Sequence, residues 1–216
     1  MSSLRVRYQT IEFGEVDIHV RTLRDRYQYL DVDGIAEKAG IFSASWPLFG
    51  VVWASGKILA HLMLDYEIAG RRILEVGCGI ALASLVLNHR RADITATDHH
   101  PEAERFLLEN VKLNQGNTIP FVRTGWGDAV SSLSDFDLII GSDLLYERGH
   151  ADMLAGFIDQ HARPHCEVIL VDPGRGQQAR FTKKMTGLGY SYYQQKPAAT
   201  NLSAEPFLGR ILRYTR

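Results

Sequence analysis

Long hydrophobic runs, cysteines and an excess of charge of either sign are all scarce in this chain of 216 residues. The longest apolar stretches, such as 136–141, are far shorter than the roughly 20 residues that a membrane span needs. No basic region followed by an apolar one opens the chain, so no secretory signal is expected. Two cysteines, Cys78 and Cys166, provide neither a disulfide framework nor a metal site. We therefore expect a cytoplasmic protein with no membrane partner and no bound metal.

The composition that remains is that of a soluble globular domain. Hydrophobic residues make up 45% of the chain and charged residues 23%, which argues against a disordered, collagen-like or coiled-coil protein. The length predicts one domain with at most a small appendage. We assign residues 1–44 to an N-terminal β-hairpin extension with a linker, and residues 45–216 to the main domain.

The net charge of −1 conceals an uneven distribution of charge. Residues 173–216 carry eight Lys and Arg against one acid, Glu205, so that segment has a charge of +7 and the rest of the chain −8. A basic segment of this kind either forms a solvated face or faces an acidic partner. Nucleic acid is the less favoured partner, but this segment keeps it open.

Strands alternate with helices over most of the chain. Apolar residues at every second position predict a strand at 16–23, which pairs with 4–13 across Gly14. Ser55 is the expected N-cap of one helix and Pro101 the first residue of another. Strands are predicted at 72–76, 94–97, 121–123, 136–141 and 168–171, helices at 55–68, 81–89, 101–114, 149–162 and 177–187, and a closing antiparallel pair at 190–194 and 210–214.

This order predicts an α/β fold with a Rossmann-like, doubly wound sheet of seven strands. The sheet is mostly parallel and ends in an antiparallel C-terminal strand. Such sheets bind their ligands at the carboxyl ends of the strands. The residues that follow each predicted strand are therefore the candidates for a functional site.

A glycine turn follows the first strand of this sheet, in the stretch Glu75-Val76-Gly77-Cys78-Gly79. A dinucleotide fingerprint requires a third glycine at the position of Leu82. The alternative, the Glu-x-Gly-x-Gly-x-Gly turn of S-adenosylmethionine enzymes, fits with one departure, Ala81. Asp98 ends the second strand, 19 residues after Gly79, where a carboxylate can accept both hydroxyls of a ribose.

Other interpretations of these residues stay open. The turn itself can be a simple strand-to-helix connection, and Asp98 can be the N-cap of the next helix. Glu75 either holds an amino group of the cofactor or orders the glycine turn. His99 and His100 fit a solvated turn, and Trp53 and Trp126 fit ordinary packing.

Four blocks of sequence resemble the seven-strand S-adenosylmethionine-dependent methyltransferases. Within them, the match is to the methyltransferase-like protein-lysine methyltransferases and their bacterial relatives, over roughly residues 45–195. The pattern Asp-x-x-Tyr at 143–146 together with Trp53 is the most discriminating part, while Ala81 and Ser142 depart from the pattern of the group. The blocks are 52–56, 74–79 with Asp98, 126–128, and 136–146, with 172–175 resembling the bacterial branch.

The resemblance implies S-adenosyl-L-methionine as the cofactor and a protein lysine as the methyl acceptor. Asp143 and Tyr146 are the implied catalytic residues, and their spacing places them on one helix face if the segment turns into a helix. Otherwise Asp143 caps that helix and Tyr146 packs. Arg175 meets either an acidic group of the substrate or the ends of the strands. The implied cofactor-binding residues are Trp53, Glu75, Gly77, Cys78, Gly79, Asp98, His99, Trp126, Asp128 and Ser142.

Two alternatives to protein-lysine methylation remain. One is methylation of a small molecule or of another protein side chain on the same scaffold. The other, from a different class, is a cofactor-binding interaction module without chemistry. The sequence does not specify the substrate, the degree of methylation or the oligomeric state.

Overall fold

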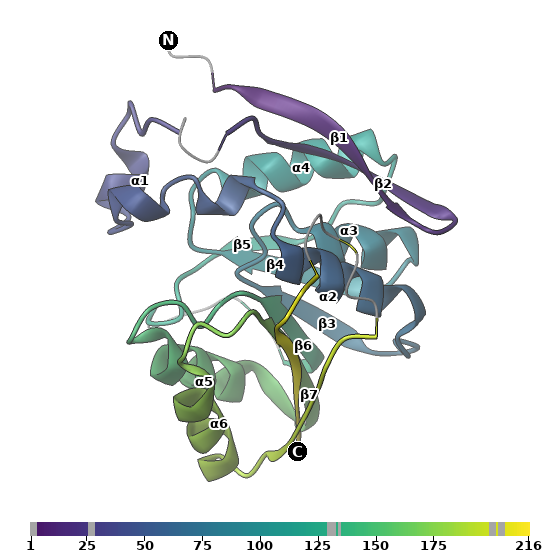
Figure 1. Ribbon diagram of the computed structural model, residues 1–216, viewed down its shortest axis with the longest axis vertical. Helices are drawn as coiled ribbons and strands as arrows, with labels where there is room; N and C mark the ends of the chain where they lie inside the picture. The colour runs from purple at the N-terminus through teal and green to yellow at the C-terminus, as the bar shows by residue number, and fades with distance from the viewer. Residues whose placement is uncertain (1–3, 26–28, 129–132, 134, 199–201, 203–205) are drawn as a thin grey trace.

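A hairpin begins the chain, and a seven-stranded sheet with helices on both faces follows it (Figure 1). The computed structural model describes residues 4–25, 29–128, 133, 135–198, 202 and 206–216. The hairpin pairs β1 with β2 in antiparallel register, with Val6 opposite Leu23 and Phe13 opposite Val16. Its strands are β1 (Val6–Phe13) and β2 (Val16–Leu23), and the sheet contains β3 (Arg72–Val76), β4 (Asp93–Asp98), β5 (Phe121–Arg123), β6 (Phe136–Ser142), β7 (Ala162–Asp172), β8 (Ser191–Gln195) and β9 (Arg210–Thr215).

The strand order in the large sheet is β5-β4-β3-β6-β7-β9-β8. The pairs from β5 to β7 are parallel, and β9 is antiparallel to both β7 and β8. The predicted fold class is therefore confirmed. Because the chain winds outward from β3 through β4 to β5 and then returns to β6, the order reverses between β3 and β6. A crevice is expected at the carboxyl ends of these two strands.

Alternating side chains build a separate core on each face of the sheet. Ile73 lies in the core on one face, while Leu74 lies in the core on the other. The same alternation continues in β7, where Ile169 joins the first core and Leu170 the second. The first core is covered by α2 (Ala54–Asp65), α3 (Leu82–His89), α4 (Ala103–Leu113) and the hairpin, and the second by α5 (His150–His161) and α6 (Gln178–Gly187).

The predicted elements lie close to the observed ones, but two predicted helix starts are wrong. The N-cap of α2 is Trp53, and Ser55 lies buried in the first turn of the helix. The helix α4 begins at Ala103, so Pro101 belongs to the turn that precedes it. The loop expected between β8 and β9 lies partly outside the described residues.

The segment before the sheet consists of short helical turns. It contains α1 (Ile35–Lys38) and the 3-10 turns η1 (Ser43–Ser45) and η2 (Leu48–Gly50). By length and composition alone, the stretch Ser43–Asp65 is apolar enough to cross a membrane. Here that stretch is divided into η1, η2 and α2, and α2 places Leu59 and Met63 in the first core.

Two asparagines, Asn110 in α4 and Asn114 at its C-cap, hydrogen-bond the free backbone edge of β2 in the hairpin. Oδ1 of Asn110 accepts a hydrogen bond from the backbone N–H of Arg21 at 2.6 Å. Asn114 accepts from the N–H of His19 at 2.8 Å and donates to its carbonyl at 2.7 Å. The guanidinium of Arg21 also stacks over the ring of Phe106, 4.4 Å from its centroid. The hairpin is thus held on the domain by polar bonds as well as by apolar packing.

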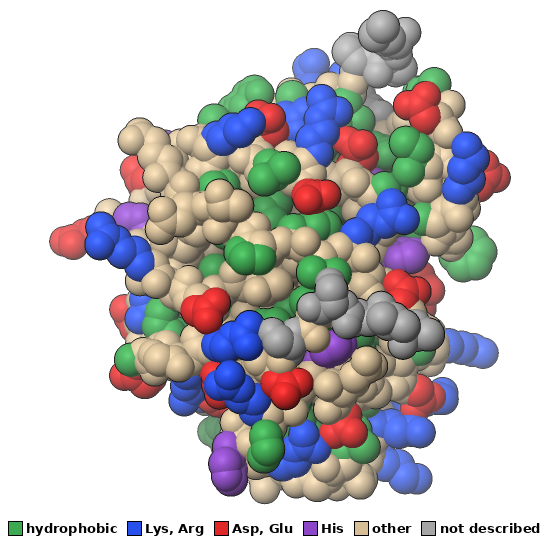
Figure 2. All heavy atoms as spheres, turned by 180° about the vertical axis from the view of Figure 1, so that it is seen from behind, with side chains coloured by type: hydrophobic (Ala, Val, Ile, Leu, Met, Phe, Trp, Pro, Cys, Tyr) green, Lys and Arg blue, Asp and Glu red, His purple; other side chains and the backbone are tan. Residues whose placement is uncertain are grey.

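Most of the basic C-terminal segment is paired within the protein. Ion pairs join Arg175 to Asp143, and both Arg180 and Lys184 to Asp152. On the face seen in Figure 2, Lys and Arg side chains are interspersed with Asp and Glu. The charge of +7 in the sequence therefore does not form a separate basic surface on this face. Two further ion pairs of the same kind are Arg213 with Glu167 and Arg216 with Asp159.

We predict that Asn110→Ala lowers the free energy of unfolding by about 2 kcal/mol. The reason is that the buried N–H of Arg21 and the carbonyl of Ile80 both lose their side-chain partner. Asn114→Ala is the matched control, because the backbone groups of His19 that it bonds are exposed to water. Urea unfolding of both variants measures the difference. Equal losses in the two variants would contradict the prediction.

Candidate functional site

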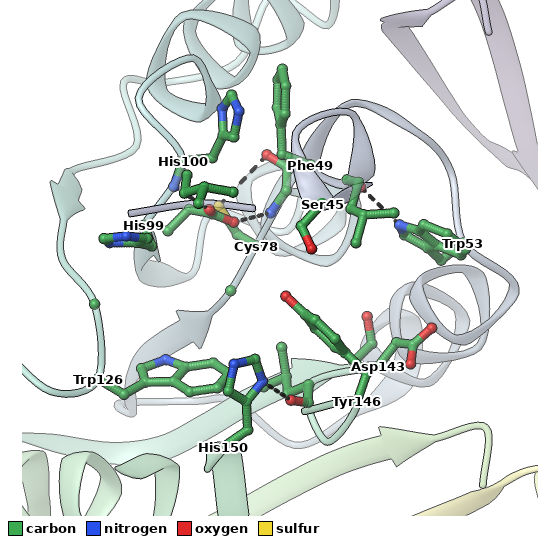
Figure 3. A pocket seen from close by; sticks show the side chains of 18 of the residues that line it. Ser45, Phe49, Trp53, Cys78, His99, His100, Trp126, Asp143, Tyr146 and His150 are labelled. Atoms are coloured by element: carbon green, nitrogen blue, oxygen red, sulfur yellow. Dashed lines mark hydrogen bonds between the residues drawn. The ribbon is translucent and has the colours of Figure 1, made fainter. Parts of the chain in front are cut away.

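A cavity of about 630 Å³ lies at the carboxyl ends of β3, β4, β5 and β6. This is the crevice at which the strand order of the sheet reverses. Segment 40–53 forms the opposite wall (Figure 3). All twelve residues predicted for the site line this cavity: Trp53, Glu75, Gly77, Cys78, Gly79, Asp98, His99, Trp126, Asp128, Ser142, Asp143 and Tyr146.

The glycine turn between β3 and α3 forms the floor of the cavity. Gly77 and Gly79 have φ of 59° and 55°, a left-handed conformation that glycine adopts without strain. A Cβ at Gly79 would lie 2.9 Å from the carbonyl oxygen of Phe49. Ala81, which departs from the glycine pattern, has φ of 61° and is the N-cap of α3. The backbone conformation thus explains a preference for glycine at position 81.

Two carboxylates hold this turn in place. Asp98 accepts hydrogen bonds from the N–H of Gly79 and the N–H of His100, both at 2.8 Å. Glu75 accepts from the N–H of Ser84 at 2.8 Å and from its hydroxyl. Burial raises the pKa of Glu75 to about 7 and also raises the pKa of Asp98.

These bonds exclude the role of helix cap for Asp98 and support the role of ordering the glycine turn for Glu75. Asp98 does not cap the next helix, because α4 begins at Ala103 with Glu102 at its N-cap. The bonds from Ser84 show that Glu75 orders the start of α3. A carboxylate offers about four acceptor positions, so each acid retains capacity for a ligand.

Two more predicted residues belong to the turn after β5. Asp128 accepts bonds from the N–H of Gly125 at 2.5 Å and the hydroxyl of Thr124 at 3.2 Å. Trp126 meets the ring of His150 edge to face, with centroids 5.0 Å apart (Figure 3). Asp128 therefore shapes the turn that presents Trp126 to the cavity.

Cys78 and Ser142 contribute small side chains to the wall. The thiol of Cys78 is buried, and burial raises its pKa well above the usual value. The backbone N–H of Cys78 bonds the carbonyl of Thr97 at 2.9 Å. A protonated, buried thiol is a poor nucleophile. Ser142, the last residue of β6, faces Gly56 at the start of α2.

Segment 40–53 carries wall residues that the sequence did not reveal. No periodic pattern marks this stretch, and its contacts come from residues far along the chain. The wall residues that were not predicted include Ile41, Phe42, Ser45, Leu48 and Phe49. Within the segment, the indole N–H of Trp53 bonds the carbonyl of Leu48 at 2.9 Å.

The two histidines after β4 anchor this wall. Nε2 of His99 lies 2.7 Å from the carbonyl oxygen of Ala39. His100 is buried and stacks on Phe49, with ring centroids 3.8 Å apart. The expectation of a solvated turn is therefore wrong for His100, whose ring packs against Phe49 and Tyr29. Burial lowers the pKa of His100 to about 4, so the ring is neutral at pH 7.

Asp143 and Tyr146 follow β6 in an irregular segment rather than in a helix. Asp143 has φ of 53° and bonds the carbonyl of Val171 through its N–H at 2.9 Å, and α5 begins only at His150. The expectation of one helix face, like that of a helix cap at Asp143, is wrong. Tyr146 is 44% exposed, and its ring contacts that of His150 edge to face. Figure 3 shows Asp143 and Tyr146 across the cavity from Ser45 and Trp53.

Arg175 pairs with Asp143 through two hydrogen bonds. Nε donates to Oδ1 at 3.0 Å and Nη2 donates to Oδ2 at 2.8 Å. These bonds raise the pKa of the Arg175 guanidinium. Arg175 therefore bonds the end of a neighbouring strand, one of the two roles that the sequence left open. It also lines the cavity itself.

A family model described as "Lysine methyltransferase" matches residues 46–187. The chain belongs to this lysine methyltransferase family. Its fold and its cofactor, S-adenosylmethionine, are those predicted from the resemblance.

Named relatives agree with this assignment. The electron transfer flavoprotein beta subunit lysine methyltransferase of Mus musculus is 28% identical over 145 residues, which cover 65% of this chain and 56% of the relative. The calmodulin-lysine N-methyltransferase of Arabidopsis thaliana is 25% identical, over 65% of this chain and 50% of the relative. The chain spans about half the length of the curated relatives it matches.

Among solved structures, the T. thermophilus 16S rRNA N2 G1207 methyltransferase in complex with AdoMet and guanosine has a TM-score of 0.64. It is 17% identical and covers 98% of this chain and 51% of its own length. This likeness concerns the fold.

We predict that His100 makes stability fall on acidification. Its pKa of about 4 in the fold lies below the ordinary value of 6.5, so the unfolded chain binds the proton first as the pH drops from 6.5 to 4. The loss reaches about 3 kcal/mol. Glu75, with a raised pKa, gives the opposite slope between about 4.5 and 7. The contribution of His100 is therefore measured as a difference between wild type and variant.

Urea unfolding of the wild type and of His100→Phe at pH 7 and pH 4 isolates this contribution. Phenylalanine keeps a ring on Phe49 but cannot be protonated, so the stability advantage of the wild type should shrink at pH 4. His89→Gln, at an exposed histidine, is the control and should follow the wild type. Parallel pH curves for the wild type and His100→Phe would refute the prediction.

Proposed function

We propose that this chain transfers a methyl group from S-adenosylmethionine to a lysine side chain of a protein. The observation that carries this proposal is the position of Tyr146 and Asp143. Both lie at the end of β6, on the same cavity as the glycine turn of β3. The relatives named as methyltransferases of electron transfer flavoprotein and calmodulin lysines support a protein acceptor.

The residues of the cavity fit the cofactor. The glycine turn is crowded, since a Cβ at Gly77 would lie 2.6 Å from Leu144, and a cradle of this kind admits a ligand close to the backbone. Asp98 and Glu75 supply acceptors where a ribose and an ammonium group would bind. When bound, the cofactor supplies a methyl carbon that accepts the lone pair of a neutral amine, while the electrons of the C–S bond return to sulfur.

The protein mainly aligns the amine and keeps it unprotonated. Partial desolvation, followed by the charge of Glu147, raises the pKa of Tyr146 to about 12. Tyr146 is therefore a phenol at neutral pH, and it orients the amine by hydrogen bonding rather than by accepting its proton. The ring of His150 packs on Tyr146 and on Trp126, and this cluster of rings reduces access of water, which disfavours an ammonium.

The proposal is tested by incubating the purified chain with methyl-tritiated S-adenosylmethionine and defined acceptors. The acceptors are electron transfer flavoprotein β subunit, calmodulin and a cell lysate separated into protein, RNA and small molecules. Label on a protein lysine, located by mass spectrometry, is the expected result. Label confined to RNA or small molecules would contradict the proposal. Cofactor binding by calorimetry without any labelled product would instead favour an interaction module.

We predict that Tyr146→Phe lowers kcat by at least tenfold while the affinity for S-adenosylhomocysteine changes less than twofold. The phenol oxygen is lost from the acceptor side, and the glycine turn is untouched. Calorimetry and initial rates measure the two quantities. Tyr193→Phe, at an exposed tyrosine of β8, is the control. Wild-type activity of Tyr146→Phe would show that Tyr146 does not belong to the acceptor side of the cavity.

For Asp143, the other proposed catalytic residue, Asp143→Asn is the suitable variant. Alanine at φ of 53° would add backbone strain to the loss of charge, whereas asparagine tolerates the left-handed conformation. We expect Asp143→Asn to retain cofactor affinity and to lower the rate of methyl transfer. The same rate and calorimetry measurements apply, and full activity would exclude a role for this carboxylate.

A further inference from the structure

The cavity has an unbalanced set of charged side chains. Among the described residues that line it, Arg175 is the one Lys or Arg side chain. An acidic cavity attracts a cationic cofactor and a lysine ammonium alike. The carboxylates that line it are Glu75, Asp98, Asp128, Asp143 and Glu147.

Attraction of the ammonium opposes the chemistry of methyl transfer. A lysine amine has a pKa of about 10.4, and only its neutral form has a lone pair to donate. An unpaired carboxylate within about 4–6 Å of the ammonium stabilises the charged form by about one pKa unit or more. A carboxylate on the acceptor side therefore improves binding of the lysine but makes it less reactive.

Arg175 forms an ion pair with Asp143, the carboxylate on the acceptor side of the cavity. Its two parallel hydrogen bonds engage both oxygens of Asp143, whose side chain is only 11% exposed. The N–H bond of Asp143 to Val171 fixes its backbone, and the two bonds from Arg175 hold its carboxylate. Gly174 and Gly176, which flank Arg175, have φ of 97° and 88°. These conformations suit glycine and shape the loop that delivers the guanidinium.

We propose that Arg175 is a positioning residue that neutralises Asp143, so that the acceptor lysine is held in this cavity as a neutral amine. This role rests on the proposed function. In this role Arg175 does more than stabilise the fold, because the ion pair determines the net charge next to the acceptor amine. The other titratable groups around the pair are Tyr146, Glu147 and His150 after β6, Asp172 at the end of β7, and Glu75, Asp98, His99 and Asp128 on the cofactor side.

The test is the pH dependence of kcat in Arg175→Gln at saturating S-adenosylmethionine. The acceptor is whichever of electron transfer flavoprotein β subunit, calmodulin and the labelled lysate protein is methylated fastest by the wild type. We expect the acid limb of the kcat profile to move by about one pH unit to higher pH. At pH 7, kcat falls about tenfold, while KM for the acceptor is unchanged or lower. Arg175→Lys, which keeps the positive charge, should restore most of the wild-type profile.

Two comparisons separate this role from a structural one. Arg163→Gln removes another Arg–carboxylate pair, with Asp137, outside the cavity, and should leave the profile unchanged. Combining Arg175→Gln with Asp143→Asn should return the acid limb to its wild-type position, because both side chains are then uncharged and their sum equals that of the neutral ion pair. This double variant, compared with Asp143→Asn alone, carries the test if Arg175→Gln alone does not fold.

Three outcomes would overturn the proposal. An unshifted profile with a raised KM in Arg175→Gln would show that Arg175 instead binds an acidic group of the acceptor. A double variant that keeps the shifted profile of Arg175→Gln would show that Arg175 acts without Asp143. Absence of lysine methylation by the wild type would overturn the proposed function as well, and so is distinguished from failure of this inference alone.

Discussion

The carboxylate of Asp98 joins the two turns on which the cavity depends. One oxygen holds the N–H of Gly79 and the other holds the N–H of His100. The first bond fixes the glycine turn after β3, and the second fixes the turn that leads into α4. Because β3 and β4 are paired in parallel register, this one side chain sets the distance between the floor of the cavity and the residues that support its opposite wall.

The opposite wall is built from the contacts that this turn presents. His100 stacks beneath Phe49, and His99 meets the carbonyl of Ala39. Phe49 in turn places its own carbonyl so close to Gly79 that no side chain fits there. Floor and wall therefore determine each other, and a neutral His100 is part of the arrangement. A charged imidazole buried between the rings of Phe49 and Tyr29 would lose more hydration energy than its neighbours return, and the pKa of His100 is lowered for this reason.

The sequence predicted well what depends on local pattern and poorly what depends on distant contacts. The alternation in β3 and β7 and the spacing of glycines and acids are local, so the fold, the glycine turn and Asp98 could be predicted from them. The resemblance of four blocks of sequence to known methyltransferases added the other predicted residues that line the cavity. Segment 40–53 has no such pattern, because its conformation follows from Phe49 meeting His100. The helix on which both interpretations of Asp143 depended does not begin there. The N–H of Asp143 instead bonds Val171 of the neighbouring strand, a partner that is distant in the sequence.

Charge shows the same dependence on tertiary structure. Counted along the chain, residues 173–216 form a basic segment of +7. Folded, Arg180 and Lys184 are paired with Asp152 away from the cavity, whereas Arg175 faces the cavity and pairs with Asp143. The charges of an ion pair largely cancel at a distance, but each member still acts on the groups that it contacts. The net charge of the segment is therefore less informative than the position of one guanidinium, that of Arg175. Among the described residues that line the cavity, it is the one Lys or Arg side chain, against five carboxylates. That guanidinium weakens the hold of an acidic cavity on a protonated amine.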